Sequence, residues 1–395
     1  MPPNEATEKA PFVMNLLDQK DVFLDNIRPF VGMGHYATVA GVNKEMKDLY
    51  EKFCNSVGDP PKVLLSANEK RPATSKDTFL SVAFCNVSCA EYWHNDDNTC
   101  KAPKNMFVCR HIAKVGSLAV LQWARKKGYL WDEQTCSCAT EAGSFEVLKW
   151  AHANGCPWDR RTCCAAAKHG HFDILKWGHE NGCKWDIQTC SCAAAAGHFE
   201  ILKWARANGC RWDQRTCTAA ARHGHFNVLK WARNNGCPWS AGTCSGAAQG
   251  GHFGILKWAR ENGCPWEEHT CSNAAENRDL EMLKWARNNG CPWTAATCQF
   301  AARCGHLEML QWARDNGCPW NIYTCHEAAR QGCLNVLKWA RNYGYPWTAE
   351  TSCFAALGGN LELLQWARRN GLPWDSPACK LAAKYGHFEL LKWAR

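Results

Sequence analysis

The sequence predicts an all-α fold, a solenoid of the right-handed type in which helix-turn-helix units pack one against the next. Three observations predict it. The triplet Leu-(Lys/Gln)-Trp occurs eleven times, always 27 residues apart, from Leu121 to Leu391. A Thr-Cys pair recurs in phase with it, and so does an Asn-Gly pair. A fixed period of this size is typical of stacked repeats, in which each unit buries its apolar face against its neighbours.

Residues 162–188 represent one copy. Thr162 is predicted to cap a first helix of two turns that stops at Gly170, because Thr is a good N-cap and Gly a natural helix end. A second, longer helix is predicted from Phe172 to the Asn-Gly pair that ends at Gly182. The loop that follows most second helices reads Cys-Pro-Trp, and its Pro forbids further helix. Each copy is therefore helix, tight turn, helix and short loop.

The 22 Trp and 27 Cys are unusually many, and both follow the period. A Trp stripe at regular spacing is most simply a buried core, and two Trp per copy are predicted to supply most of the stacking energy. The recurring Lys and Arg of Leu-Lys-Trp-Ala-Arg are predicted to form a solvated or Trp-stacked outer stripe. Since neighbouring helices lie about 8–10 Å apart, a disulfide ladder between equivalent Cys is excluded, and buried reduced thiols are expected. These are Cys136, Cys163, Cys190, Cys217, Cys244, Cys271, Cys298 and Cys325.

The run Ala-Ala-x-x-Gly-His-x-Glu, as in residues 301–308, is similar to the centre of the ankyrin repeat. The resemblance covers residues 107–395, in eleven copies. Three features depart from the family: the period is 27 instead of 33, Thr-Cys replaces the Thr-Pro-Leu-His opening, and Ala-Arg replaces the paired Leu of the second helix, as in Ala205-Arg206. The missing residues fall in the connecting loop, so the β-hairpin finger is expected to be lost or reduced. The resemblance implies a protein-binding scaffold without catalysis.

The first hundred residues have a different pattern. Residues 1–11 are predicted to be disordered, 56–77 to be a linker, and 78–106 to form a degenerate helical cap. Residues 12–55 suggest three short helices that either cap the array or resemble an F-box, although the Pro, Cys and Trp of that motif are absent. The F-box resemblance implies binding to a ubiquitin-ligase adaptor. Solenoid ends need a polar-faced cap, which favours the capping role.

A zinc site is the other chemistry to weigh in this region. Cys85, Cys89, His94, Cys100 and Cys109 are close in sequence, but their spacing fits no paired Cys-x-x-Cys pattern. Cys109 also occupies the array's own Cys position. We therefore predict no metal and no other cofactor.

Charge and composition narrow the functional classes further. The formal net charge is +9, and the excess of Lys and Arg falls within residues 111–395, interleaved with Asp and Glu. No signal peptide and no membrane-spanning stretch is evident, so a protein of the cytoplasm or nucleus is expected. We also expect it to be a monomer. The sequence contains no phosphate-binding Gly loop, no Gly-x-Ser-x-Gly elbow and no metal-protease His pair, so an enzyme is not expected.

Positions that vary from copy to copy are free of packing, and they are either plain solvent-exposed surface or candidate contacts with a partner protein. They fall between Ala-Ala and Gly of the first helix and in the loop after the second Trp. The leading hypothesis is a protein-protein interaction scaffold; a substrate-recognition subunit of a ubiquitin ligase and a nucleic-acid-binding array are the alternatives. The candidate partner-binding residues are Arg160, Arg161, Lys168, His169, Arg215, Arg222, His223, His269, Arg303, Tyr323, Arg330, Lys384 and Tyr385.

Overall fold

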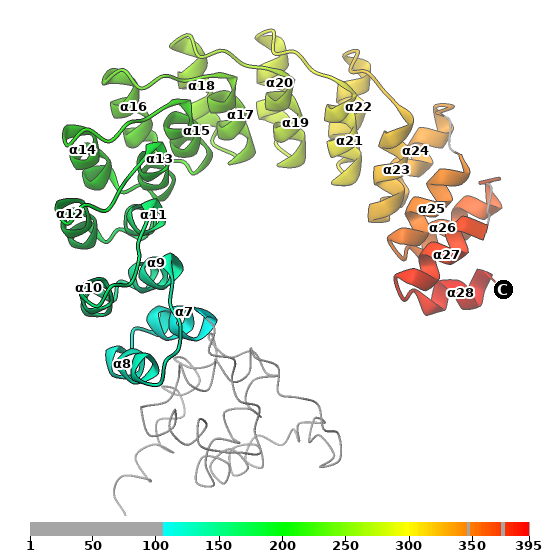
Figure 1. Cartoon of the computed structure of the whole chain (residues 1–395). Helices are drawn as coiled ribbons and strands as arrows, with labels where there is room; N and C mark the ends of the chain where they lie inside the picture. The colour runs from blue at the N-terminus through cyan, green and yellow to red at the C-terminus, as the bar shows by residue number, and fades with distance from the viewer. Residues whose placement is uncertain (1–105, 346–347, 373–375, 395) are drawn as a thin grey trace, which may run out of the picture. The chain divides into compact units, whose positions relative to one another are not determined.

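The computed structural model describes residues 106–345, 348–372 and 376–394, which form helices and connecting turns and contain no strand (Figure 1). The predicted all-α fold of repeated helix pairs is confirmed for these residues. Contacts divide the chain into two units, between Thr162 and Cys163. The segments predicted at 1–11, 12–55 and 56–77, and all but the last residue of 78–106, lie outside the described residues.

Helices alternate between a first and a second position in each copy. In the first unit they are α7 (Met106–Val115), α8 (Leu118–Lys126), α9 (Glu133–Glu141) and α10 (Phe145–Ala153). Then follows α11 (Arg160–His169), and the later first helices are α13 (Ile187–Ala196), α15 (Gln214–Arg222), α17 (Ala241–Gln249), α19 (Glu268–Glu276), α21 (Ala295–Arg303), α23 (Ile322–Gln331), α25 (Ala349–Leu357) and α27 (Ser376–Lys384). The second helices are α12 (Phe172–Glu180), α14 (Phe199–Ala207), α16 (Phe226–Asn234), α18 (Phe253–Glu261), α20 (Leu280–Asn288), α22 (Leu307–Asp315), α24 (Leu334–Asn342), α26 (Leu361–Arg369) and α28 (Phe388–Ala394).

The start of the first helix differs from the prediction. The predicted N-cap Thr lies inside the helix and is fully buried, as Thr216 is. The N-cap is three residues earlier, where Asp213 has extended backbone and its carboxylate accepts a hydrogen bond from the N–H of Arg215 at 3.0 Å. An Asp is as good a cap as a Thr, and the extra turn makes the first helix as long as the second. The prediction of a shorter first helix was therefore wrong.

The first helices are built to pack closely. Their buried positions carry Thr, Cys and Ala, and in α15 the residues Thr216, Cys217, Ala220 and Ala221 are all fully buried. Such small side chains let successive odd-numbered helices of the second unit lie directly against one another. In that unit these helices line the inner side of an arc, and the even-numbered helices lie outside them (Figure 1).

The second helices are held apart by aromatic rings. Trp204 of α14 meets Phe172 of the preceding copy edge-on at 5.7 Å and the loop residue Trp185 at 5.6 Å. The same two contacts recur at Trp231, Trp258 and Trp285. Among the described Trp, nearly all are half-buried, so the predicted Trp core packs between copies but is covered only in part. Wide rings in one layer and small side chains in the other give the second unit its curvature.

The eight cysteines at equivalent positions of the first helices are buried, as predicted. Cys237, in the loop after α16, donates its S–H at 3.4 Å to the carbonyl of Asp213, the N-cap of α15 in the same helix pair. The same bond recurs from Cys210, Cys264, Cys291 and Cys318. Cys217 hydrogen-bonds to the Cys237 thiol, and this bond together with burial raises the pKa of Cys217. The described cysteines are free thiols.

Candidate protein-binding surface

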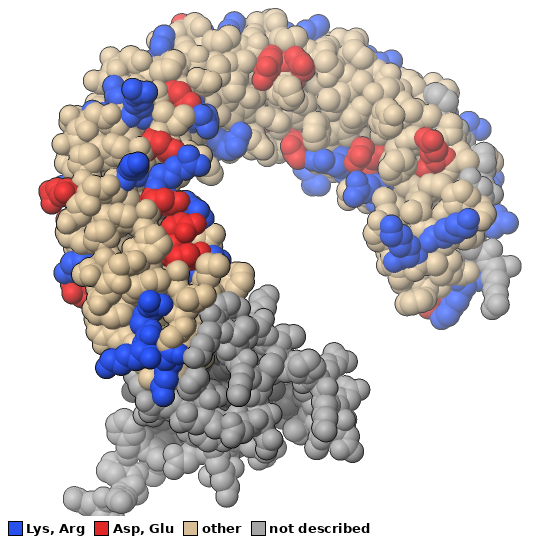
Figure 2. All heavy atoms as spheres, in the orientation of Figure 1, with Lys and Arg blue, Asp and Glu red and all other residues tan. Residues whose placement is uncertain are grey.

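The exposed side of the odd-numbered helices is here named the first-helix face. It is the part of each copy that neither the Thr-Cys-Ala-Ala core nor the aromatic layer uses. In the second unit, Lys and Arg alternate with Asp and Glu along the inner side of the arc that these helices line (Figure 2). A surface of this kind, mixed in charge and repeated in one dimension, is suited to contact an extended partner.

All of the predicted partner-binding residues lie on odd-numbered helices or at the residue that follows one. Those assigned to a loop after the second Trp in fact begin the first helix, because the helix starts earlier than predicted. Arg160 and Arg161 lie in the first turn of α11, within the first unit; Arg215, His269 and Tyr323 lie in the first turns of α15, α19 and α23. At the opposite helix ends lie Lys168, His169, Arg222, His223, Arg303, Arg330, Lys384 and Tyr385. Of the whole set only Arg303 is half-buried, and the others are exposed.

Three of the five candidates of the first turn are paired with the acidic residue that immediately precedes their own helix. The Arg215 guanidinium donates to the Asp213 carboxylate at 2.9 Å, and Arg161 donates in the same way to Asp159 at 3.0 Å. His269 lies 3.4 Å from Glu267. These side chains therefore help to fix the helix start, and part of their charge is already neutralised within the copy.

The candidates at the helix ends form fewer ion pairs within the array. Lys168, Arg222 and Arg330 are exposed and form no ion pair with any described residue. They occupy the same position in three copies. At that position in two other copies, Arg303 is paired with Glu276 and lies 4.5 Å over the ring of Phe300. The free cations thus form an interrupted row along the second unit.

Aromatic residues lie on part of this face, and the sequence analysis identified only one of them. The His326 ring stacks on Phe354 at 4.7 Å and meets the exposed ring of Tyr323 edge-on at 5.7 Å. His326 is 1% exposed, and its burial lowers its pKa, although Glu350 opposes this. The signal available in the sequence was His326, at a position where earlier copies hold Ser, Cys, Thr or Gln; at the position of Phe354 an earlier copy already has Phe300.

The second helices offer a different, more uniform surface. The Arg206 guanidinium lies 4.2 Å over the Trp212 ring, and the Lys203 ammonium lies 4.1 Å over the Phe199 ring. Equivalent pairs recur in the neighbouring copies. The predicted Trp-stacked outer stripe is therefore confirmed for the Arg, whereas the Lys lie over Phe rings. Because these cations are held against rings of their own copy, they are less available to a partner.

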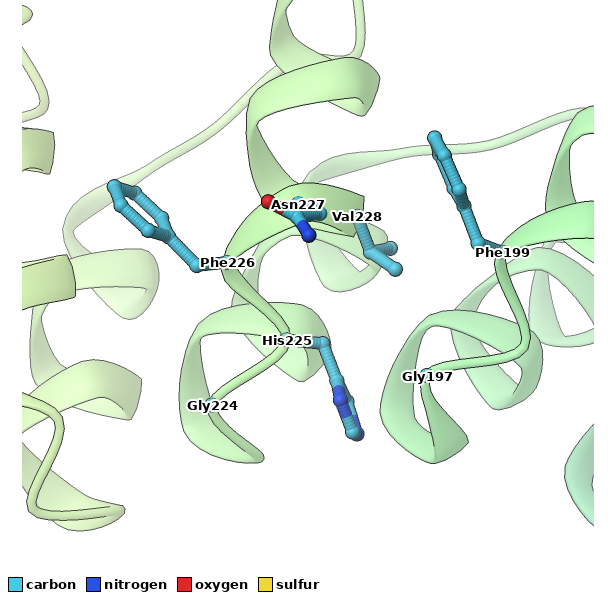
Figure 3. A pocket seen from close by; sticks show the side chains of 7 residues that line it. All are labelled: Gly197, Phe199, Gly224, His225, Phe226, Asn227 and Val228. Atoms are coloured by element: carbon cyan, nitrogen blue, oxygen red, sulfur yellow. The ribbon is translucent and has the colours of Figure 1, made fainter.

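A shallow hollow opens between two copies near the ends of α13 and α15 (Figure 3). The rings of Phe199 and Phe226 stand on either side of it. Its one titratable side chain, His225, reaches across to the preceding copy, where its Nε2 lies 3.0 Å from the carbonyl of Ala195. The hollow therefore repeats the packing between copies and brings no set of polar groups together. It is lined by Gly197, Phe199, Gly224, His225, Phe226, Asn227 and Val228.

The described residues hold no group of three or more His, Cys, Asp and Glu side chains able to bind a metal ion. Of the residues weighed for zinc, Cys109 alone is described; it is buried on α7, and burial raises its pKa to about 12. No described helix is both long enough and apolar enough to cross a bilayer.

Comparison with known proteins agrees with this geometry. Residues 163–206 match the family described as ankyrin repeats (many copies). The array is built of ankyrin-like repeats. No curated protein matches the chain significantly.

Among solved structures, the ankyrin-like array is similar to the pentatricopeptide repeat protein PPR10 in complex with an 18-nt psaJ RNA element. The identity is 12% and the TM-score 0.41, over 98% of this chain and 66% of that one, just under two thirds of its length. It is also similar to the human ASB11 ankyrin repeat domain, with 18% identity and a TM-score of 0.29, over 52% of this chain and 97% of that one.

Proposed function

We propose that the ankyrin-like array is a non-catalytic scaffold that binds a partner protein along its first-helix face. The observation that carries this proposal is the contrast between the two sides of each odd-numbered helix. The buried side repeats Thr, Cys and Ala from copy to copy, whereas the exposed side changes, with Lys168, Arg222 and Arg330 unpaired. Side chains that are exposed, varied and uncommitted are those able to select a partner.

The partner expected from this chemistry carries acidic side chains spaced along an extended surface. Successive helices lie about 8–10 Å apart, so cations two copies apart are separated by roughly 20 Å. Several copies together offer enough length for an interface of ordinary size, about 800 Å² on each partner. Ion pairs at such a rim chiefly raise the association rate and the specificity.

The proposal is tested by affinity purification of the full chain followed by mass spectrometry. A triple variant, Lys168→Glu, Arg222→Glu and Arg330→Glu, reverses the free cations of the first-helix face. A matched variant, Lys184→Glu, Arg211→Glu and Lys338→Glu, makes the same change of charge at exposed positions outside that face. We expect the first variant to lose the partner proteins and the second to retain them.

Two results would contradict the proposal. Equal retention by both variants would show that binding does not use the first-helix face. Loss of the captured proteins after nuclease treatment, together with a steep fall in binding as salt rises, would favour the nucleic-acid alternative. The ubiquitin-ligase alternative depends on residues 12–55, which lie outside the described residues. It would be supported if the full chain captures a ligase adaptor and a chain without residues 12–55 does not.

A further inference from the structure

One guanidinium on the first-helix face shows how the array itself holds a cation there. Arg303 of α21 is paired with Glu276 of the preceding copy and lies 4.5 Å over the ring of Phe300, one turn earlier on its own helix. A carboxylate and an aromatic ring thus hold the positive group together. Guanidinium groups favour such a setting, because they are planar and weakly hydrated, and can stack on a ring while donating to a carboxylate.

The boundary between α23 and α25 presents groups of the same kind. The exposed ring of Tyr323 and the carboxylate of Glu350 both lie against His326, the ring at a centroid distance of 5.7 Å and a carboxylate oxygen 4.0 Å from Nε2. The His326 ring is stacked on Phe354, which holds it in place. No described Lys or Arg is paired with Glu350, and Arg330, the free cation of α23, lies towards the other end of that helix.

The two exposed side chains stand where other copies carry positive or titratable groups. Tyr323 and Glu350 each come directly before the buried Thr of their first helix, and the same position in three earlier copies holds Arg161, Arg215 and His269. The change from these residues to an aromatic ring and a carboxylate reverses what this part of the surface can attract. It favours a cationic group of a partner over an anionic one.

His326 adds a polar group that lacks a hydrogen bond. The residue is 1% exposed, and neither Nδ1 nor Nε2 has a hydrogen-bond partner among the described residues. Burial lowers the pKa of His326, so at neutral pH the ring is uncharged and one of its nitrogens can accept a hydrogen bond. The 4.0 Å between Nε2 and the Glu350 carboxylate is too long for a direct bond. A donor can enter between them, because the Glu350 side chain is 74% exposed and free to move aside.

We propose that Tyr323, His326 and Glu350 form a binding site for an arginine side chain of a partner protein. The guanidinium lies over the Tyr323 ring and donates to the Glu350 carboxylate, and a further N–H reaches the His326 Nε2. An ammonium group fits less well, because it cannot lie flat on the ring while donating to two acceptors. This site rests on the proposed function, and it adds one arginine to a partner whose other contacts on this face are acidic.

The site is tested with a random peptide library displayed on phage and selected on the full chain. Peptides that also bind the double variant Tyr323→Leu, Glu350→Gln are removed by counter-selection. We expect the remaining peptides to share an arginine. In synthetic copies, citrulline at that place keeps the shape without the charge and should weaken binding at least about tenfold, as measured by fluorescence anisotropy. Lysine should weaken binding less than citrulline does.

A matched variant controls for changes of composition. Tyr343→Leu with Glu308→Gln makes the same two changes at exposed positions outside the first-helix face, and it should bind the selected peptides as the unchanged chain does. Circular dichroism checks that both double variants keep their helices.

Three results would overturn the arginine site. They are a selection that yields no peptide able to distinguish the double variant, binding that is unchanged by citrulline, and lysine binding as tightly as arginine. The proposed function fails separately, when the triple charge-reversal variant retains every partner protein that the unchanged chain captures.

Discussion

The two helix layers of the array pack by opposite means. First helices use Thr, Cys and Ala, and in α15 the packed residues are fully buried. Second helices use half-buried rings, such as Trp204 between Phe172 and Trp185, with cations over the rings. Packing by small residues uses one side of a helix and leaves the other free to vary. Packing by rings uses much of the exposed surface as well, which is why the proposed binding surface belongs to the first layer.

The largest expected effect tests the close packing of the first layer. Ala220 is fully buried on α15, which lies directly against α13 and α17. Replacement by Leu adds three carbons where there is no space, and we expect Ala220→Leu to lower the free energy of unfolding by about 3 kcal/mol. Urea denaturation followed by circular dichroism measures the change. A loss of less than about 1 kcal/mol would mean that the first helices have room to spare, and the comparison between layers would fail.

The second effect tests the aromatic layer. Trp204→Ala removes two edge-on ring contacts and opens a gap between copies. A fully buried Trp lost in this way costs about 3–5 kcal/mol, so for a half-buried ring we expect about 2 kcal/mol. Trp204→Phe, measured in the same urea experiment, should recover part of the loss because it restores an aromatic edge. If Trp204→Ala leaves the free energy of unfolding unchanged, the rings do not stabilise the packing of the second helices.

Much of this contrast could be predicted from the sequence, but its detail could not. The 27-residue period and the helix ends at Gly fixed the repeat unit, because both are local signals. The first-helix start was misplaced because Thr216 and Asp213 are both good caps, and only tertiary burial of the Thr decides between them. The Trp side chains are half-buried because of the distance between neighbouring copies, and the sequence of one copy does not predict that distance.

The sequence predicted where the residues of the candidate site lie, but not which side chains they pair with. Variation between copies located the first-helix face. The partners of Arg161 and Arg215, two residues earlier in each copy, could have been found from spacing once the helix start was known.

A smaller effect is expected when the same substitution, Gly to Ala, is made in a first helix and in a second helix. A Cβ on Gly250, at the end of α17, would lie 2.0 Å from the carbonyl oxygen of Arg222 in the preceding copy, whereas a Cβ on Gly254 of α18 would meet nothing within 4 Å. We expect Gly250→Ala to cost about 1–2 kcal/mol through the shift it forces. Gly254→Ala should add about 0.5–1 kcal/mol, because Ala is the better helix former. Thermal melts of the two variants should move in opposite directions, and a shared sign would show that the layers do not differ in spacing here.

The smallest effect concerns the cations of the two layers. Arg206 lies over Trp212 and donates to the carbonyl of Cys210 at 2.6 Å, so Arg206→Gln should lower stability by about 0.5–1 kcal/mol. Arg222, exposed and without an ion pair to the described residues, should tolerate Arg222→Gln within about 0.5 kcal/mol. Urea titrations of the two variants give the difference between their free energies of unfolding, and Arg206→Gln should be the less stable. If Arg222→Gln proved the more costly, Arg222 would be needed for folding, and its freedom to serve a partner, on which the proposed function depends, would be lost.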